Sequence, residues 1–183
     1  MLNLKNSRIF TQQTIYRDVA HNLKKVREFK EKISEEYQNH RNNFRDCYTY
    51  IENYGRNKYK SGNYLDFLAK TTNATETCKN EIEKIIQQDY IKANGNNFNV
   101  NPRLKNATDF LRKEILGKNV QHNYNKSLER AIYELLQTIR DNLIHYGKFE
   151  VSENQYERNY LIIKNASIIS DNLVKQLEKM EKE

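Results

Sequence analysis

Apolar residues recur at spacings of three and four along most of the chain, which is the pattern of amphipathic helices. The longest run extends from Ile15 to Tyr54 and contains neither glycine nor proline. Its apolar positions are Ile15, Val19, Leu23, Val26, Phe29, Ile33, Tyr37, His40, Phe44, Cys47, Ile51 and Tyr54. A straight helix of about 40 residues would be about 60 Å long, which exceeds a compact bundle of this size. The pattern therefore predicts either a kink near residues 38–43 or a dimer that covers the overhanging stripe.

Shorter periodic segments follow, and glycine, proline and asparagine separate them. Residues 55–62 predict a basic turn with a glycine at each end. The helices expected after this turn lie at about 63–70, 73–93, 102–117, 125–146 and 153–182. Asn73 and Asn101 are suitable N-caps, and the single proline, Pro102, suits the first position of a helix. Ile162, Ala166, Ile169, Leu173, Leu177 and Met180 form one stripe on the last of these helices.

No strand pattern or internal repeat is visible, so the fold class expected is all-α. We expect an antiparallel bundle of about five or six helices in one domain of residues 1–183. A helical extension would lie at about 8–54, and the part at about 125–182 carries the arginine–histidine motif described below. The chain has no apolar run near the length of a membrane span and no apolar segment at its start. Cys47 and Cys78 stand alone, without the spacing of a zinc site. These features predict a cytoplasmic protein without a metal or membrane partner.

The net charge of +7 changes this picture only in part. Residues 1–60 hold 13 basic and 7 acidic side chains, so most of the positive excess lies there. A basic face attracts phosphate backbones. The best basic–aromatic patch combines Tyr48, Tyr50, Tyr54, Tyr59 and Tyr64 with Arg45, Arg56, Lys58 and Lys60. RNA contact at Arg56, Lys58 and Lys60 is one interpretation, although most tyrosines at helical spacing simply pack.

Candidate chemistry concentrates at the end of the helix expected at 125–146. Leu128, Ile132, Leu135, Leu136, Ile139 and Leu143 form its apolar face. Gly147 stands where this helix would stop. Asp141 and His145 are four residues apart and share a face, whereas Arg140 is about 140° from His145 around an ideal helix. One copy of the chain therefore places Arg140 and His145 poorly for joint action, and two copies across a dimer axis would place them better. The structural alternative is a surface arginine and a histidine that caps carbonyl groups.

Residues 140–147, Arg-Asp-Asn-Leu-Ile-His-Tyr-Gly, resemble the signature of the HEPN superfamily. That signature is an arginine, a polar residue, three or more further residues and a histidine, often followed closely by glycine. The resemblance covers about residues 125–182. It implies a helical bundle that dimerises so that two motifs face one cleft. Many HEPN proteins are metal-independent endoribonucleases of toxin–antitoxin and antiviral defence systems, and others have lost catalysis and serve as binding modules.

The resemblance implies that Arg140 and His145 are the catalytic pair and that Asp141 orients the groups of the site. His145 would exchange a proton with the 2′-hydroxyl or the leaving 5′-oxygen, and Arg140 would stabilise charge on the phosphate. The implied products are a 2′,3′-cyclic phosphate and a 5′-hydroxyl, with no cofactor. Asn142, Tyr146 and Lys148 are further candidates for RNA contact. The implied partners are an RNA substrate, a second copy of the chain and a possible antitoxin or regulatory protein.

The other histidines are weaker candidates. Arg17-Asp18-Val19-Ala20-His21 echoes the motif but is one residue shorter, and it is interpreted as helix surface. His40 falls on the apolar stripe and is expected in the core, whereas His122 is expected in a loop without a partner. Two alternatives to an endoribonuclease stay open. One is a silent HEPN module that binds a protein or RNA, and the other is an unrelated interaction protein whose first helix forms a coiled coil.

Overall fold

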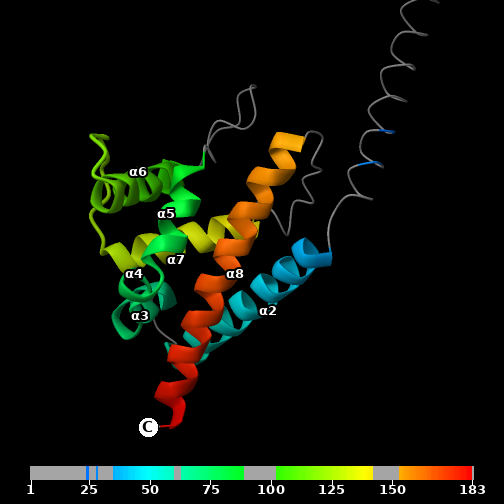
Figure 1. Cartoon of the computed structure of the whole chain (residues 1–183). Helices are drawn as coiled ribbons and strands as arrows, with labels where there is room; N and C mark the ends of the chain where they lie inside the picture. Colours follow the sequence, from blue (N-terminus) through cyan, green and yellow to red (C-terminus); the bar gives the residue numbers. More distant parts are fainter. Residues whose placement is uncertain are drawn as a thin grey trace, which may run out of the picture.

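The structure is a computed structural model that describes residues 35–59, 63–88, 102–141 and 153–182, together with Lys24 and Glu28. Within these ranges it contains helices and no strand, which confirms the all-α class (Figure 1). The helices are α2 (Glu35–Lys58), α3 (Tyr64–Thr71), α4 (Ala74–Thr77), α5 (Lys79–Gln87), α6 (Pro102–Leu116), α7 (Leu128–Arg140) and α8 (Glu153–Lys182). Seven helices in the described part exceed the predicted five or six. Most of the predicted helical extension at 8–54 lies outside the described ranges.

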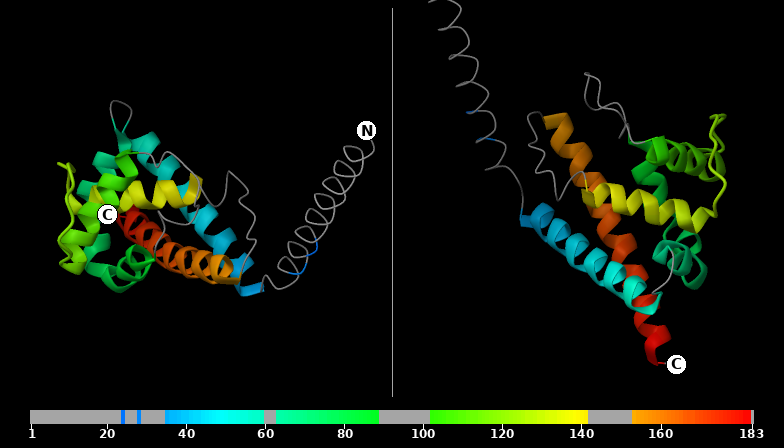
Figure 2. Two further views of the ribbon diagram at one scale, coloured as in Figure 1. Left: turned by 90° about the horizontal axis from the view of Figure 1, so that it is seen from above. Right: turned by 180° about the vertical axis from the view of Figure 1, so that it is seen from behind.

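The two longest described helices, α2 and α8, lie side by side and run in the same direction (Figures 1 and 2). Near their N-terminal ends, Lys164 Nζ pairs with Glu36 Oε1 at 3.1 Å. Near their C-terminal ends, the Tyr50 hydroxyl donates to Glu181 Oε2 at 3.4 Å. The predicted antiparallel arrangement is therefore wrong for this pair. Antiparallel packing is expected of helices joined by a short loop, and the whole segment 59–152 separates these two.

The remaining helices form a second layer against this pair. Helix α7 crosses behind α8 in Figure 1 and in front of it in the view from behind in Figure 2. Helix α5 packs on α8, α6 packs on α7, and α3 contacts both α2 and α7. The core between the layers contains the inward faces of α2, α5, α6, α7 and α8. Its largest fully buried side chains include Tyr37, Phe44, Tyr48, Ile51, Ile82, Leu111, Tyr133 and Leu135.

Helix α2 differs from its prediction at both places where a break or an end was expected. It runs unbroken through residues 38–43, where a kink was one of the two alternatives. It also continues through Gly55 to Lys58, so the first four residues of the predicted basic turn are helical. The reason is packing: a Cβ added to Gly55 would lie 2.8 Å from Tyr64 Cδ2 and 3.0 Å from Leu68 Cδ1. Gly55 therefore permits close approach of α3 rather than a turn.

The helix predicted at 73–93 is two helices within the described part. Asn73 caps α4 as expected, because its side chain accepts from the Glu76 amide at 3.1 Å. The backbone leaves helical geometry at Cys78, with φ −133° and ψ 30°, and α5 begins directly afterwards. The Glu129 carboxylate accepts from the amides of Ala74 and Thr75, at 2.8 Å each, and so anchors the start of α4 to α7. Residues 89–93 lie outside the described ranges.

Other helix boundaries follow local signals. Helix α6 begins at Pro102, and its C-terminal glycine, Gly117, has a φ of 63°. The Gly117 amide donates to the Lys113 carbonyl at 3.0 Å, which is the bond of an αL C-cap, and the Lys118 amide donates to the Arg112 carbonyl at 3.2 Å. Helix α7 begins at Leu128 rather than at 125, because Ser127 is its N-cap. The last predicted helix, 153–182, is confirmed as α8.

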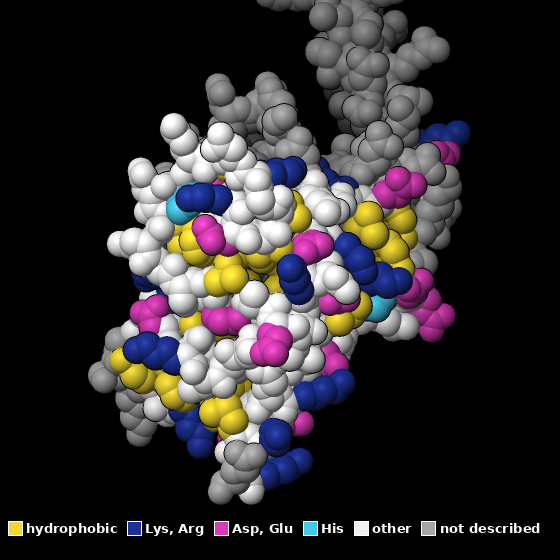
Figure 3. Space-filling model, turned by 60° about the vertical axis from the view of Figure 1, so that its left-hand side comes forward, with side chains coloured by type: hydrophobic (Ala, Val, Ile, Leu, Met, Phe, Trp, Pro, Cys, Tyr) yellow, Lys and Arg dark blue, Asp and Glu magenta, His cyan; other side chains and the backbone are white. Residues whose placement is uncertain are grey.

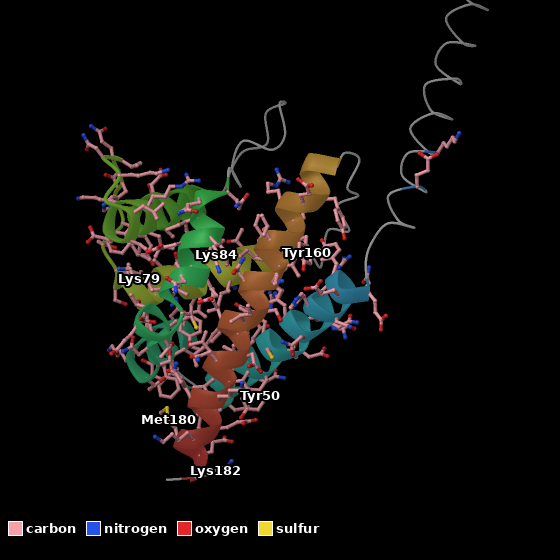
Figure 4. All side chains as sticks on the ribbon, viewed as in Figure 1. Tyr50, Lys79, Lys84, Tyr160, Met180 and Lys182 are labelled. Atoms are coloured by element: carbon pink, nitrogen blue, oxygen red, sulfur yellow. The ribbon has the colours of Figure 1, made fainter. Side chains whose placement is uncertain are left out.

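The predicted stripe of α8 is buried except at its end. Ile162, Ala166, Ile169, Leu173 and Leu177 are all fully buried. Met180 is 38% exposed, so its inward placement was wrong. Figure 4 shows Met180 near the C-terminal end of the chain. No described helix is long and apolar enough to cross a membrane.

Candidate functional site

Helix α7 carries Arg140 to its end. The Ser127 side chain accepts from the Arg130 amide at 3.2 Å and starts the helix. Along the helix, Ile132, Leu135 and Ile139 are fully buried, which fixes the rotation of α7 in the bundle. Arg140 is the last residue assigned to the helix, and Asp141 retains helical dihedral angles. The side chain of Arg140 therefore leaves the core at the end of the helix and turns toward α2.

Three groups surround the Arg140 guanidinium. Its Nε and Nη2 donate to Asp141 Oδ1 at 3.0 and 2.9 Å. Its Nη1 donates to Glu52 Oε2, across 88 positions of sequence. Its Cζ lies 5.0 Å from the centre of the Tyr48 ring, which is a cation–π geometry. The Arg140 and Glu52 side chains are each 18% exposed, so this ion pair lies at the edge of solvent.

Glu52 also binds a second arginine. Its Oε1 accepts from Arg56 Nε at 3.2 Å and from Nη2 at 2.7 Å. The Tyr64 hydroxyl lies 3.5 Å from the same oxygen, and the Arg56 guanidinium lies 4.8 Å from the centre of the Tyr64 ring. One carboxylate thus holds two guanidinium groups that come from α2 and α7. We call this set the arginine–glutamate cluster; its members are Tyr48, Glu52, Arg56, Tyr64, Arg140 and Asp141.

The cluster keeps its charged groups ionised. Burial alone would raise the pKa of the Glu52 carboxyl, but the hydrogen bond from Arg56 and the charge of Arg140 outweigh it, and the pKa falls below its ordinary value. Burial alone would lower the pKa of Arg140, whereas the hydrogen bond to Asp141 and the nearby Tyr48 and Glu52 raise it. Burial raises the pKa of Tyr48 well above its ordinary value, so its hydroxyl stays neutral. The cluster therefore contains two positive and two negative side chains.

The structure places only part of the predicted catalytic set. Arg140 and Asp141 are described and bonded to each other. His145 lies outside the described residues, as do Asn142, Tyr146 and Lys148. The predicted orientation of His145 by Asp141 stays a prediction. The described contact of Asp141 is with Arg140, so in this structure its carboxylate orients the arginine.

The predicted basic–aromatic patch separates into two groups. Tyr48, which is fully buried, and Tyr64 belong to the arginine–glutamate cluster. The second group is a chain of near-parallel rings, with centre-to-centre distances of 6.3, 6.4 and 5.8 Å along it. In order, its rings are Tyr50, Tyr54, Phe67 and Tyr59. Lys58 Nζ lies 5.6 Å from the Tyr54 ring centre. Arg45 is exposed and pairs with Asp46, and Lys60 lies outside the described residues.

On one face of the molecule, positive and negative side chains are interspersed. On the face in Figure 3, lysine and arginine side chains alternate with aspartate and glutamate, and small apolar patches lie between them. Arg56 and Lys58 are both exposed at the end of α2. The distinguishing feature of the arginine–glutamate cluster is that two guanidinium groups donate to one carboxylate.

Two of the other three histidines differ from their predictions, and the third lies outside the described residues. His40 is partly buried rather than in the core: its Nε2 lies 3.5 Å from Glu36 Oε1, and its ring packs against Tyr160 of α8. His122 has partners, because its Nδ1 accepts from the Tyr124 amide at 3.2 Å and its ring packs edge-on against Phe110 at 5.1 Å. His21 is outside the described ranges. Among the described residues, no group of three or more His, Cys, Asp or Glu side chains has a geometry suited to a metal ion.

Sequence reasoning missed Glu52. A weak signal was present, because Glu52 and Arg56 have the four-residue spacing of a helical ion pair. Such pairs are common on exposed helices and carry no information about a partner 88 residues away. Compared with protein-family models, with curated proteins and with solved structures, the chain matches none of them.

Proposed function

We propose that this chain is a metal-independent endoribonuclease of the HEPN type. It would cleave single-stranded RNA by attack of a 2′-hydroxyl on the adjacent phosphate, leaving a 2′,3′-cyclic phosphate and a 5′-hydroxyl. The supporting observation is the end of α7. Arg140, the first residue of the Arg-polar-x3-His motif, reaches the edge of solvent there in a cluster with a second arginine. Flexible RNA is required because the attacking oxygen, phosphorus and leaving oxygen must align.

In this proposal, Arg140 stabilises the charge that develops on the phosphate and His145 transfers the proton. The two hydrogen bonds from Arg140 to Asp141 support a role for Asp141 in orienting the guanidinium. Because Arg140 and His145 are poorly placed on one ideal helix, two copies would contribute to one cleft. The biological role we propose is that of a toxin or antiviral effector in the cytoplasm, under the control of an antitoxin or another regulatory protein.

A second function has one specific observation in its favour. Two carboxylates, Glu52 and Asp141, already neutralise Arg140 in the described structure. An arginine held in this way fits a catalytically silent HEPN module. In such a module, the ion pairs of Arg140 stabilise the fold and the surface binds a protein or RNA. The two functions differ in whether the chain cleaves RNA at all.

The test is RNA cleavage in EDTA by the wild type, His145→Ala and Arg140→Ala. Arg45→Ala is the matched control, because Arg45 is an exposed arginine on α2 that pairs only with its neighbour Asp46 among the described contacts. We expect wild-type and Arg45→Ala proteins to cleave, and the His145 variant to lose about 100-fold or more. The new ends should be a cyclic phosphate and a 5′-hydroxyl. A folded wild type that leaves RNA intact would support the binding module instead.

A measurement of size in solution tests the shared cleft. The two-copy cleft requires a dimer at the protein concentrations at which cleavage occurs. Sedimentation of an active, strictly monomeric protein would contradict the two-copy arrangement without contradicting cleavage itself.

A further inference from the structure

The arginine–glutamate cluster has the donors of an anion site, and the protein's own carboxylate fills it. Glu52 Oε1 accepts two hydrogen bonds from the Arg56 guanidinium, and Oε2 accepts one from Arg140. Two guanidinium groups on one anion is an arrangement that proteins use for carboxylates and phosphates alike. The Glu52 side chain is 18% exposed, so its carboxylate already reaches the edge of solvent.

We propose that Arg56 and Arg140 form a binding site for a phosphodiester group of single-stranded RNA, and that the Glu52 carboxylate occupies this site until the RNA displaces it. The inference rests on the proposed function for the identity of the ligand, and it deepens that function by adding Arg56 to the site. Glu52 is then an internal competitor of the substrate.

Charge supports this exchange. With Glu52 in place, two guanidinium groups face the carboxylates of Glu52 and Asp141. Rotation of Glu52 away leaves one uncompensated positive charge, and a phosphodiester carries the one negative charge that replaces it. Because the group at the site changes while the local charge does not, the exchange avoids the cost of an unpaired, partly buried guanidinium.

Each guanidinium group has a contact that does not depend on Glu52. The Tyr48 ring lies 5.0 Å from Arg140 Cζ, and the Tyr64 ring lies 4.8 Å from Arg56 Cζ. Asp141 retains its two hydrogen bonds to Arg140 when Glu52 leaves. Arg140 therefore stays fixed without Glu52, whereas the exposed Arg56 keeps only its contact with the Tyr64 ring and can adjust to the incoming phosphate.

The test measures binding without cleavage. The probe is a labelled 2′-O-methyl oligouridylate about 16 nucleotides long, which covers the size of known single-strand sites and has no free 2′-hydroxyl to attack. Fluorescence anisotropy at fixed salt compares the wild type with Glu52→Gln. Asp46→Asn is the matched control, because it removes one negative charge from an exposed position on the same helix. Circular dichroism and urea unfolding establish that each variant is folded.

We expect Glu52→Gln to bind the probe about fivefold tighter or more, the low end for losing the attraction between a carboxylate and a guanidinium in contact that the RNA otherwise has to displace. Asp46→Asn should change the affinity less than about twofold, as expected for a screened surface charge. Adding Arg56→Gln to the Glu52 variant should abolish the gain. A folded Glu52→Gln protein that binds no more tightly than wild type would overturn the inference, as would an equal gain in Asp46→Asn.

A second comparison keeps the inference testable if Glu52→Gln does not fold. In the wild-type background, Arg56→Gln should weaken binding and reduce the slope of log affinity against log salt by about 0.7. Lys79→Gln removes the same charge from an exposed position on α5 (Figure 4), a helix that contributes no residue to the cluster, and should leave the slope unchanged. Equal slopes in the two variants would refute the site.

Failure of the inference and failure of the proposed function give different results. If the wild type cleaves RNA but Glu52→Gln binds the probe no more tightly, the phosphate site is wrong and the endoribonuclease stands. If Glu52→Gln tightens binding but no protein cleaves, the site stands as part of an RNA-binding module.

Discussion

Gly55→Ala is expected to destabilise the protein, although the same change inside most helices stabilises it. Gly55 lies within α2 and packs against α3. Alanine is favoured over glycine in a helix by about 1 kcal/mol. Helix propensity alone therefore predicts a gain in the free energy of unfolding.

Packing predicts the opposite sign. The added Cβ would lie 2.8 Å from Tyr64 Cδ2, 3.0 Å from Leu68 Cδ1 and 3.2 Å from Leu68 Cγ. Leu68 is fully buried and cannot move away without disturbing the core. Overpacking of this kind costs about 1–3 kcal/mol. With three close contacts we place Gly55 in the upper part of that range, which leaves a net loss of about 1–2 kcal/mol after the propensity gain.

The assay is urea unfolding followed by circular dichroism, with Asn53→Ala as the control. Asn53 is exposed on the same helix, two positions before Gly55, and should gain about 0.5 kcal/mol from helix propensity alone. The two alanine substitutions should therefore change stability in opposite directions. A Gly55→Ala protein as stable as the wild type, or more stable, would refute the close packing of α2 and α3.

Three further predictions concern other contacts. Glu129→Ala should lower the free energy of unfolding by about 1–2 kcal/mol in urea, because the first two amides of α4 lose their acceptor; no loss would contradict the anchoring of α4. Tyr133→Phe should cost about 1 kcal/mol, because its buried hydroxyl forms a 2.8 Å hydrogen bond with Thr72, and a neutral result would contradict this bond. The folded-state pKa of Glu52 lies below its ordinary 4.5, so ionised Glu52 stabilises the fold above about pH 4.5 and that contribution disappears as the pH falls through the lowered pKa. The stability difference between wild type and Glu52→Gln should therefore shrink on acidification below pH 4.5, and a constant difference would refute the ion pair's contribution.

Local signals were sufficient for the helical class and for several helix ends. Asn73, Pro102 and Gly117 act within one turn of their own backbone, as an N-cap, a first-turn residue and a C-terminal glycine. The apolar stripe of α8 predicted its bounds, because burial of one helix face requires only that some partner exists. Such features depend on residues three or four apart, and sequence alone determines them.

The tertiary structure decided the features that need a particular partner. Gly55 is a turn residue by its local preference, and only the approach of α3 makes it a packing residue inside α2. Met180 continues the stripe of α8, yet the bundle ends before it and leaves it exposed. The same holds for the candidate site. Sequence indicated Arg140 and Arg56 separately, but their meeting on Glu52 depends on how α7 crosses α2, and residues 88 positions apart leave no periodic trace of such a contact.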